Sequence, residues 1–213
     1  MAVVLAPVCA ACREPLEQPT RGAVCDVCWS TAVPVVPLGC DSIPPAITLA
    51  TAIGPYEGRL RDIIHALKYD PRPTIARHLG LRMRQAGAPV LVGADVVVPV
   101  PLHRTRERAR GFNQARTLAI HLGLPLSDAL ARRRKTESQA DLPAERRRAN
   151  VDGAFCVRPR SLVKDRIVVL VDDVRTTGAT LTACATALLD AGAVEVRALT
   201  AAKAALKADR VPR

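Results

Sequence analysis

Apolar and polar residues follow two patterns along the chain, one typical of buried strands and the other of amphipathic helices. Residues 94–101 and 166–171 are almost entirely aliphatic and precede polar segments, as buried parallel strands do. Apolar residues recur at helical spacing in 57–69, which predicts a helix with one apolar face. Further strands are expected at 47–53 and 194–200, and further helices at 74–86, 111–122 and 180–191. Because strands and helices alternate, the pattern predicts an α/β fold with a parallel sheet.

The first forty residues differ from this pattern, because they are punctuated by cysteine and proline and show no sustained helical or strand period. They contain four of the seven cysteines, namely Cys9, Cys12, Cys25 and Cys28. The spacing Cys-x2-Cys-x12-Cys-x2-Cys is typical of a four-thiolate structural zinc site, with a redox pair and coincidence as the alternatives. We therefore predict a zinc-binding knuckle over residues 1–42 and a main domain over 43–213.

The net charge of +11 is concentrated in two segments. Residues 103–116 hold five basic residues against one acid and residues 132–148 hold seven against three, so together they supply +8. Clustered positive charge favours a phosphate-rich partner, either a polymer backbone or a small pyrophosphate ester. Aromatic residues number only five, one Trp, two Tyr and two Phe, which argues against a base-stacking platform for single strands.

The composition also bears on the compartment. No apolar run approaches the roughly 18 to 20 residues that a membrane-spanning helix needs, so we expect no membrane insertion. Cysteines grouped in two close pairs suit metal binding better than a disulfide framework. The expected location is therefore cytoplasmic.

The segment from Val168 to Thr180 joins a buried strand to a helix through two acids and a short loop. In α/β folds, ligands bind at the carboxyl ends of strands, where such a loop lies. Small residues at 177–179 let backbone N–H groups approach a phosphate, and the following helix adds the positive end of its dipole. Asp172 and Asp173 can accept hydrogen bonds from two ribose hydroxyls. The segment therefore predicts a site for a 5-phosphoribose group.

The same segment resembles the motif for 5-phosphoribosyl pyrophosphate (PRPP) of type I phosphoribosyltransferases, and every position of that motif matches. The resemblance implies that Asp172 and Asp173 hold the ribose hydroxyls. It also implies that the 5-phosphate is wrapped by five loop residues, Thr176, Thr177, Gly178, Ala179 and Thr180. An ordinary strand with an acidic turn and a helix cap would explain the strand but not the whole loop. Neither a Gly-x-Gly-x-x-Gly nor a Gly-x4-Gly-Lys-Ser/Thr sequence occurs, which disfavours other nucleotide sites.

A second predicted strand ends in a Pro-Val-Pro turn that precedes an arginine-rich loop over residues 103–114. This stretch resembles the pyrophosphate loop of the same enzymes, especially in the glutamine amidophosphoribosyltransferases. The resemblance implies PRPP contacts from Val100, Pro101 and Leu102 and catalytic contributions from Arg104 and Arg106. Guanidinium groups suit phosphate oxygens, although a solvated basic turn is the alternative.

Residues 132–150 are polar and basic and are expected to form a long mobile loop. They resemble the flexible hood of these enzymes, which closes and excludes water, and the resemblance implies catalytic roles for Arg134 and Gln139. A surface loop that never closes is the alternative. On the first predicted helix, His65 and Lys68 are expected at the exposed surface, although Lys68 could approach a phosphate.

The order of these motifs resembles the ComF family of competence-associated, phosphoribosyltransferase-like proteins. The matching pieces are the cysteine knuckle, Leu-Lys-Tyr at 67–69, Pro-Val-Pro-Leu at 99–102, Arg-Gly-Phe-Asn-Gln at 110–114, Asn-Val at 150–151, Ala-Phe at 154–155 and the Asp-Asp loop. The resemblance implies a type I phosphoribosyltransferase fold. It also implies a cytosolic protein that takes part in DNA uptake alongside a helicase-like ATPase.

The sequence leaves several functions open. An enzyme would bind PRPP with Mg²⁺ and transfer 5-phosphoribose to an unidentified acceptor, with release of pyrophosphate. A non-catalytic, PRPP-sensing module would instead contact single-stranded DNA or the helicase-like ATPase through its basic segments and knuckle. A salvage enzyme unrelated to DNA is a third reading, which the knuckle and the Arg-Gly-Phe-Asn-Gln segment disfavour. A homodimer paired at sheet edges would fit each of them.

Overall fold

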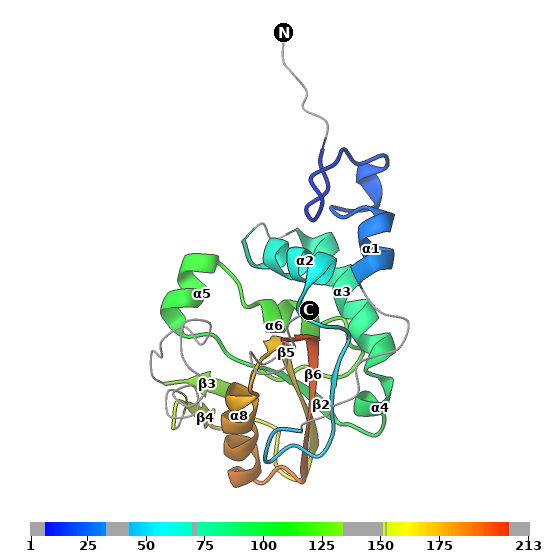
Figure 1. Cartoon of the computed structure of the whole chain (residues 1–213). Coiled ribbons are helices and arrows are strands. Elements are labelled where there is room, and N and C mark those ends of the chain that lie inside the picture. The colour runs from blue at the N-terminus through cyan, green and yellow to red at the C-terminus, as the bar shows by residue number, and fades with distance from the viewer. Residues whose placement is uncertain (1–6, 33–42, 70–71, 134–150, 152, 205–213) are drawn as a thin grey trace, which may run out of the picture.

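The computed structural model describes residues 7–32, 43–69, 72–133, 151 and 153–204, and its centre is a four-stranded parallel sheet (Figure 1). The strands are β1 (Ala50–Ala52), β2 (Val96–Pro99), β5 (Ile167–Arg175) and β6 (Glu195–Lys203), in the order β1-β6-β5-β2. All three pairings are parallel, so the carboxyl ends of the strands meet at one edge of the sheet. The predicted α/β class with a parallel sheet is confirmed.

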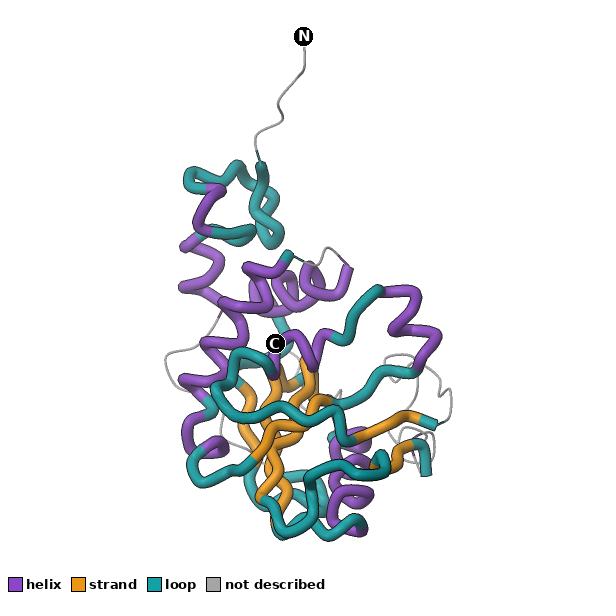
Figure 2. Tube along the Cα trace, turned by 180° about the vertical axis from the view of Figure 1, so that it is seen from behind, coloured by secondary structure: helices purple, strands orange, loops and turns teal. Residues whose placement is uncertain are grey.

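Helices cover both faces of the sheet, and β5 contributes side chains to both resulting cores (Figure 2). Val169 and Val171 join one core, while Val168 and Leu170 join the other, as the period of two in a strand requires. The first core is completed by α2 (Gly58–Tyr69), α3 (Pro73–Ala86), α4 (Ala88–Leu91) and α6 (Gln114–Ala119). The second is completed by α8 (Ala179–Asp190) and by an antiparallel pair, β3 (Leu130–Arg132) with β4 (Phe155–Val157).

Strand β5 differs from its prediction in length. We expected the strand to stop before the two acids, but it continues to Arg175, because its pairing with β6 extends to Arg175 opposite Lys203. Asp172 and Asp173 therefore lie within the strand rather than in the loop after it. The other predicted elements of the main domain are present with shifted ends, and β3 and β4 are additions.

The arginine-rich stretch after β2 is a helix, α5 (Arg104–Arg110), and not the loop that we expected. His103 caps its start by accepting a hydrogen bond from the backbone N–H of Thr105, and Gly111 ends it in the left-handed conformation at φ 81°. Arginine and alanine are good helix formers, which explains why the stretch winds up although it buries no residue. The helix predicted at 111–122 begins only after this stop, as α6.

The N-terminal knuckle packs directly onto the main domain (Figure 1). It contains a short 3₁₀ turn (Pro19–Arg21) and a helix that the sequence did not predict, α1 (Asp26–Ala32). Trp29 of α1 is buried against His78 and Arg82 of α3, with ring centroids 5.7 Å apart and the Arg82 guanidinium 4.4 Å from the indole centroid. One apolar cluster therefore runs from the knuckle into the first core. Among the described residues, no helix combines the length and apolar character needed to cross a bilayer.

Candidate functional site

The loop between β5 and α8 has the backbone that a phosphate-binding turn needs. Gly178 occupies the left-handed region at φ 79° and caps the start of the twelve-residue helix α8. A side chain there would stand 2.6 Å from the Pro44 ring, so both conformation and space favour glycine. Thr177 Oγ accepts a hydrogen bond from the backbone N–H of Ala179 at 3.4 Å, which orders the turn. This geometry directs backbone N–H groups and the positive helix end toward the carboxyl edge of the sheet.

The two acids of the predicted ribose site belong to opposite faces of the sheet, because they are consecutive in a strand. Each carboxylate accepts a hydrogen bond at 2.8 Å from the next backbone N–H, Asp172 from Asp173 and Asp173 from Val174. These bonds hold both carboxylates close to the main chain at the end of β5.

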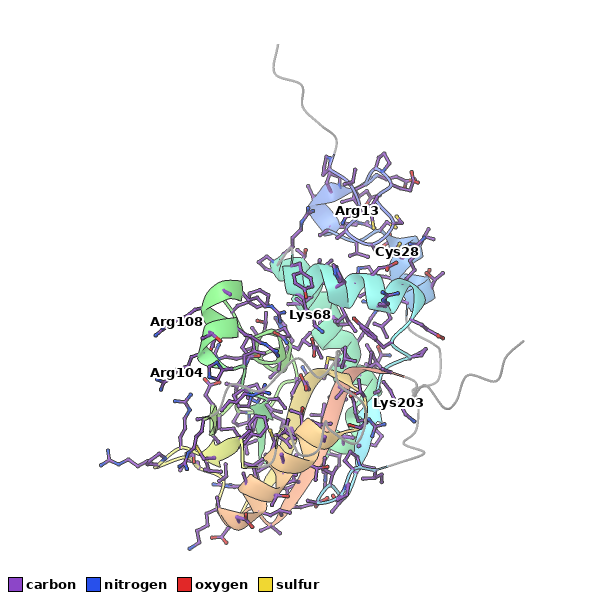
Figure 3. The ribbon with its side chains drawn as sticks, turned by 60° about the vertical axis from the view of Figure 1, so that its left-hand side comes forward. Arg13, Cys28, Lys68, Arg104, Arg108 and Lys203 are labelled. Carbon is purple, nitrogen blue, oxygen red and sulfur yellow. The ribbon has the colours of Figure 1, made fainter. Side chains whose placement is uncertain are left out.

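Lys68 was expected at the surface, and this expectation is wrong. It lies in the last turn of α2 with only 19% of its side chain exposed, and its Nζ is 2.7 Å from Asp173 Oδ2 (Figure 3). Burial alone would lower the pKa of Lys68, but the charge of Asp173 and its hydrogen-bonding contact raise it above the ordinary value. The ammonium therefore stays charged beside the acidic pair. His65, by contrast, is exposed as expected.

Asp172 has a different electrostatic environment. Burial raises its pKa well above the ordinary range, and the nearby charge of Asp173 raises it further. Arg132 of β3 lies close enough to interact with this carboxyl, and burial together with the charge of Arg106 lowers the pKa of Arg132. Thr200, the neighbour of Asp172 in β6, has a buried hydroxyl without a hydrogen-bond partner among the described residues. One acid is thus paired with a lysine, while desolvation is the largest influence on the pKa of the other.

Three of the five predicted pyrophosphate residues line a separate hollow beyond the edge of β2. A cavity of about 710 Å³ opens between the end of β2, α5 and the β3–β4 pair. Its lining includes Pro101, Leu102 and Arg104, together with Arg116, Arg132, Arg133 and Arg158. Within the described part of the chain, neither the acidic pair nor the Thr177–Ala179 turn contributes to it.

Other predicted residues of this region have different positions. Val100 is buried below the turn, and Arg106 lies on α5 beside Arg132. Arg104 and Arg108 project from α5, away from Lys68 (Figure 3). The predicted hood residues Arg134 and Gln139 lie outside the described residues. The structure therefore brings together the acids, the turn and Lys68, and it places the arginines on the adjacent wall.

The four knuckle cysteines meet in one cluster that can hold a metal ion. Their sulfur atoms all lie within 4.8 Å of one another, and Cys12 Sγ is 3.9 Å from Cys25 Sγ. Zinc–sulfur bonds of about 2.3 Å in a tetrahedron separate the sulfurs by about 3.8 Å, which matches this spacing. Within the described knuckle, all four side chains are free thiols rather than disulfides.

The close packing of these thiols also affects their protonation. Burial would raise the pKa of Cys9, but hydrogen bonds from the backbone N–H groups of Cys12, Cys25 and Ala11 lower it from 9.0 to about 6. Burial and hydrogen bonding with the neighbouring thiols raise the pKa of Cys28. Thiolate formation is therefore favoured at Cys9 and opposed at Cys28. The donor set fits zinc in a closed, structural site.

Comparisons with known proteins relate the chain to a family. The family model described as "Phosphoribosyl transferase domain" matches residues 108–211. A glutamine PRPP amidotransferase from Bacillus subtilis aligns with 63% of this chain and 30% of its own, at 26% identity and a TM-score of 0.41. The sheet topology and the family match define a protein with the type I phosphoribosyltransferase fold.

Two relatives narrow this class. "DNA utilization protein YhgH" of Salmonella typhi is 33% identical over 205 residues, which cover 89% of this chain and 87% of the relative. "Competence protein F" of Haemophilus influenzae is 32% identical over 169 residues, or 74% of each chain. The chain belongs to the ComF family of the phosphoribosyltransferase superfamily.

Proposed function

We propose that the protein binds PRPP with Mg²⁺ at the carboxyl edge of the sheet and transfers its 5-phosphoribose group to an acceptor, with release of pyrophosphate. The observation that supports this most strongly is the end of β5. There, two acids precede a left-handed glycine turn that opens a twelve-residue helix. An ordinary strand end does not require a buried acid at position 173. It also does not require a glycine at position 178, where a side chain would collide with Pro44.

In this proposal the residues divide the ligand between them. Asp172 and Asp173 hold the ribose hydroxyls, and the turn from Thr176 to Thr180 wraps the 5-phosphate. Val100, Pro101 and Leu102 lie beside the pyrophosphate, whose charge the arginines Arg104 and Arg106 offset from α5, with Arg134 and Gln139 assigned to the hood. Mg²⁺, when bound with PRPP, would neutralise further pyrophosphate charge. Departure of pyrophosphate is then favoured by positioning and charge rather than by a dedicated base.

Metal, location and biological role complete the proposal. The knuckle binds one structural Zn²⁺ per chain through Cys9, Cys12, Cys25 and Cys28. A role in competence and DNA uptake is supported by the names of its relatives, a DNA utilization protein and a competence protein. A cytoplasmic location is supported by the four knuckle cysteines, which are free thiols and not disulfides.

Calorimetric titration of PRPP with Mg²⁺ into the zinc-loaded protein tests the site. The double variant Asp172→Asn/Asp173→Asn should lose binding. Asp190→Asn is the matched control, because Asp190 is an exposed acid at the far end of α8 and should leave binding unchanged. A folded wild type that does not bind PRPP would refute the proposal. Exchange of labelled pyrophosphate in the presence of candidate acceptors then tests for transfer.

A second function is favoured by the arginine-lined cavity. Five arginines and two acids, Glu107 and Asp128, line its wall, which leaves an excess of positive charge beside α5. A PRPP-sensing module without catalysis would use this wall and the knuckle to contact single-stranded DNA or a helicase-like ATPase, as a monomer or a homodimer. Affinity for single-stranded DNA should then fall steeply between 50 and 200 mM salt, as phosphate-backbone binding does. Negligible affinity at low salt would exclude the DNA contact.

A further inference from the structure

The buried contact between Lys68 and the ribose-site acids is not explained by fold stability. A surface ammonium that is moved into a core loses hydration, and a buried ion pair usually contributes little more than an apolar pair of the same volume. Lys68 nevertheless turns inward from α2, with its Nζ 2.7 Å from Asp173 Oδ2 and 5.9 Å from the ring centroid of Tyr56. Helix α2 and the segment that carries Tyr56 therefore hold the charge of Lys68 beside the site, and both precede the site in sequence.

Tyr56 gives this arrangement a rigid base. Its backbone N–H donates to the carbonyl of Lys203 at 2.8 Å, and Pro55 forms a bridge with Lys203 at the end of β6. The ring of Tyr56 is thus fixed to the same sheet edge from which Asp173 projects. Lys68 reaches that edge from above, out of α2 (Figure 3).

The carboxylate of Asp173 is oriented but not saturated. Its Oδ1 accepts from the backbone N–H of Val174 at 2.8 Å, and its Oδ2 faces the ammonium. Oδ2 is buried, and among the described residues it forms the ion pair with the ammonium but no hydrogen bond of regular geometry. The carboxylate is thus anchored by a main-chain N–H at Oδ1 and by a cation at Oδ2, and Oδ1 keeps a lone pair that can accept a second hydrogen bond from an incoming hydroxyl.

We propose that Lys68 is a positioning residue for the pentose, which fixes the Asp173 carboxylate toward a ribose hydroxyl and offers a further N–H donor to the same sugar. This inference rests on the proposed PRPP site. Its chemical basis is that an ammonium has three donors and that a carboxylate held by two groups loses little freedom when a ligand binds. Lys68 would thus contribute to recognition of the sugar but not of the pyrophosphate.

The affinities for two different ligands, measured separately, distinguish this positioning role from a purely structural one. Calorimetry with Mg²⁺ compares PRPP with inorganic pyrophosphate, which lacks the sugar. Lys68→Met should weaken PRPP binding by about 10- to 100-fold, the usual value of a lost charge-assisted contact, and should leave pyrophosphate binding unchanged. Lys68→Arg should recover part of the loss. Lys164→Met, which replaces an exposed lysine, is the matched control and should bind both ligands as the wild type does.

A double variant keeps the test decisive if Lys68→Met leaves a buried, unpaired carboxylate and fails to fold. Lys68→Met/Asp173→Asn removes both charges and should bind PRPP within about threefold of Asp173→Asn alone, because coupled groups are not additive. Equal loss of both ligands, or full PRPP affinity in Lys68→Met, would overturn the inference and leave the proposed function standing. A folded wild type that does not bind PRPP would overturn both together.

Discussion

Replacement of Trp29 measures how firmly the knuckle is joined to the main domain. The side chain is 5% exposed and packs on His78 and Arg82 of α3. Truncation of a buried tryptophan to alanine typically costs 3 to 5 kcal/mol, and we expect Trp29→Ala to lower the free energy of unfolding by about that amount. The value includes the loss of the edge-to-face and cation–π contacts, which are each worth about 1 kcal/mol.

A second substitution at the same position separates packing from hydrogen bonding. Trp29 Nε1 is buried without a hydrogen-bond partner among the described residues, and an unsatisfied donor costs about 1 to 3 kcal/mol. Phenylalanine keeps an aromatic ring in place and removes this donor. The free energy of unfolding of Trp29→Phe should therefore stay within about 1 kcal/mol of the wild-type value. The smaller side chain loses packing, but the cost of the unsatisfied indole N–H is also removed.

Urea unfolding at saturating zinc, followed by far-UV circular dichroism, measures both variants. Val27→Ala is the control, because Val27 lies on the same helix but is 71% exposed, and it should change the stability by less than about 0.5 kcal/mol. Trp29 is the chain's single tryptophan, so its fluorescence should follow the same transition in the wild type. Separate fluorescence and dichroism transitions, or a cost below about 1 kcal/mol for Trp29→Ala, would refute a shared core.

Further predictions concern the backbone, the acids and the metal. Arg13 has φ 69°, so Arg13→Gly should stabilise the knuckle by about 1 kcal/mol in thermal unfolding. Gly178→Ala should destabilise the protein by at least about 1 kcal/mol and weaken PRPP binding, because the new Cβ is strained and meets Pro44. The Ile167 N–H and Arg166 lower the pKa of Asp95 below 3.8, so its stabilising contribution is complete above that pH and is lost as the pH falls through the lower value. Asp95→Asn should accordingly flatten the acid-side loss of stability, measured by urea titrations between about pH 5 and 2. Chelation with EDTA should release one zinc per chain and lower the melting temperature, measured by metal analysis and calorimetry.

Strongly patterned elements could be predicted from the sequence alone. The apolar stripe of α2 and the aliphatic runs of β2 and β5 each specify one period and one buried face. The tight turn before α8 could also be predicted, because Gly178 and its small neighbours suit a left-handed turn at the start of a helix. The ends of elements were less predictable. Strand β5 continues through two acids because its partner β6 continues, which is a property of the pair and not of the segment.

Elements without an apolar period were missed, because the prediction of helices and strands depended on that period. Helix α5 is charged on every side, and α1 is a short helix ordered by the cysteine cluster and by contact with α3. The inward position of Lys68 was missed because its partner Asp173 is remote in sequence. One signal was available: Lys68 follows Ile64 by four residues and so borders the apolar face of α2. Nothing local to Lys68 specifies which group it meets there.

The strand order has a consequence for the nascent chain. Strand β1 is the first of the sheet to leave the ribosome, yet its partner in the sheet is β6, the last of the described strands. Strand β5, which carries the acids, also has β6 as a neighbour. Translation must therefore reach Lys203 before the sheet can close, and contacts this distant in sequence form slowly. The proposed ligand site can therefore form only at the end of synthesis, and chaperones that shield apolar strands have the longest access to β1 and β2.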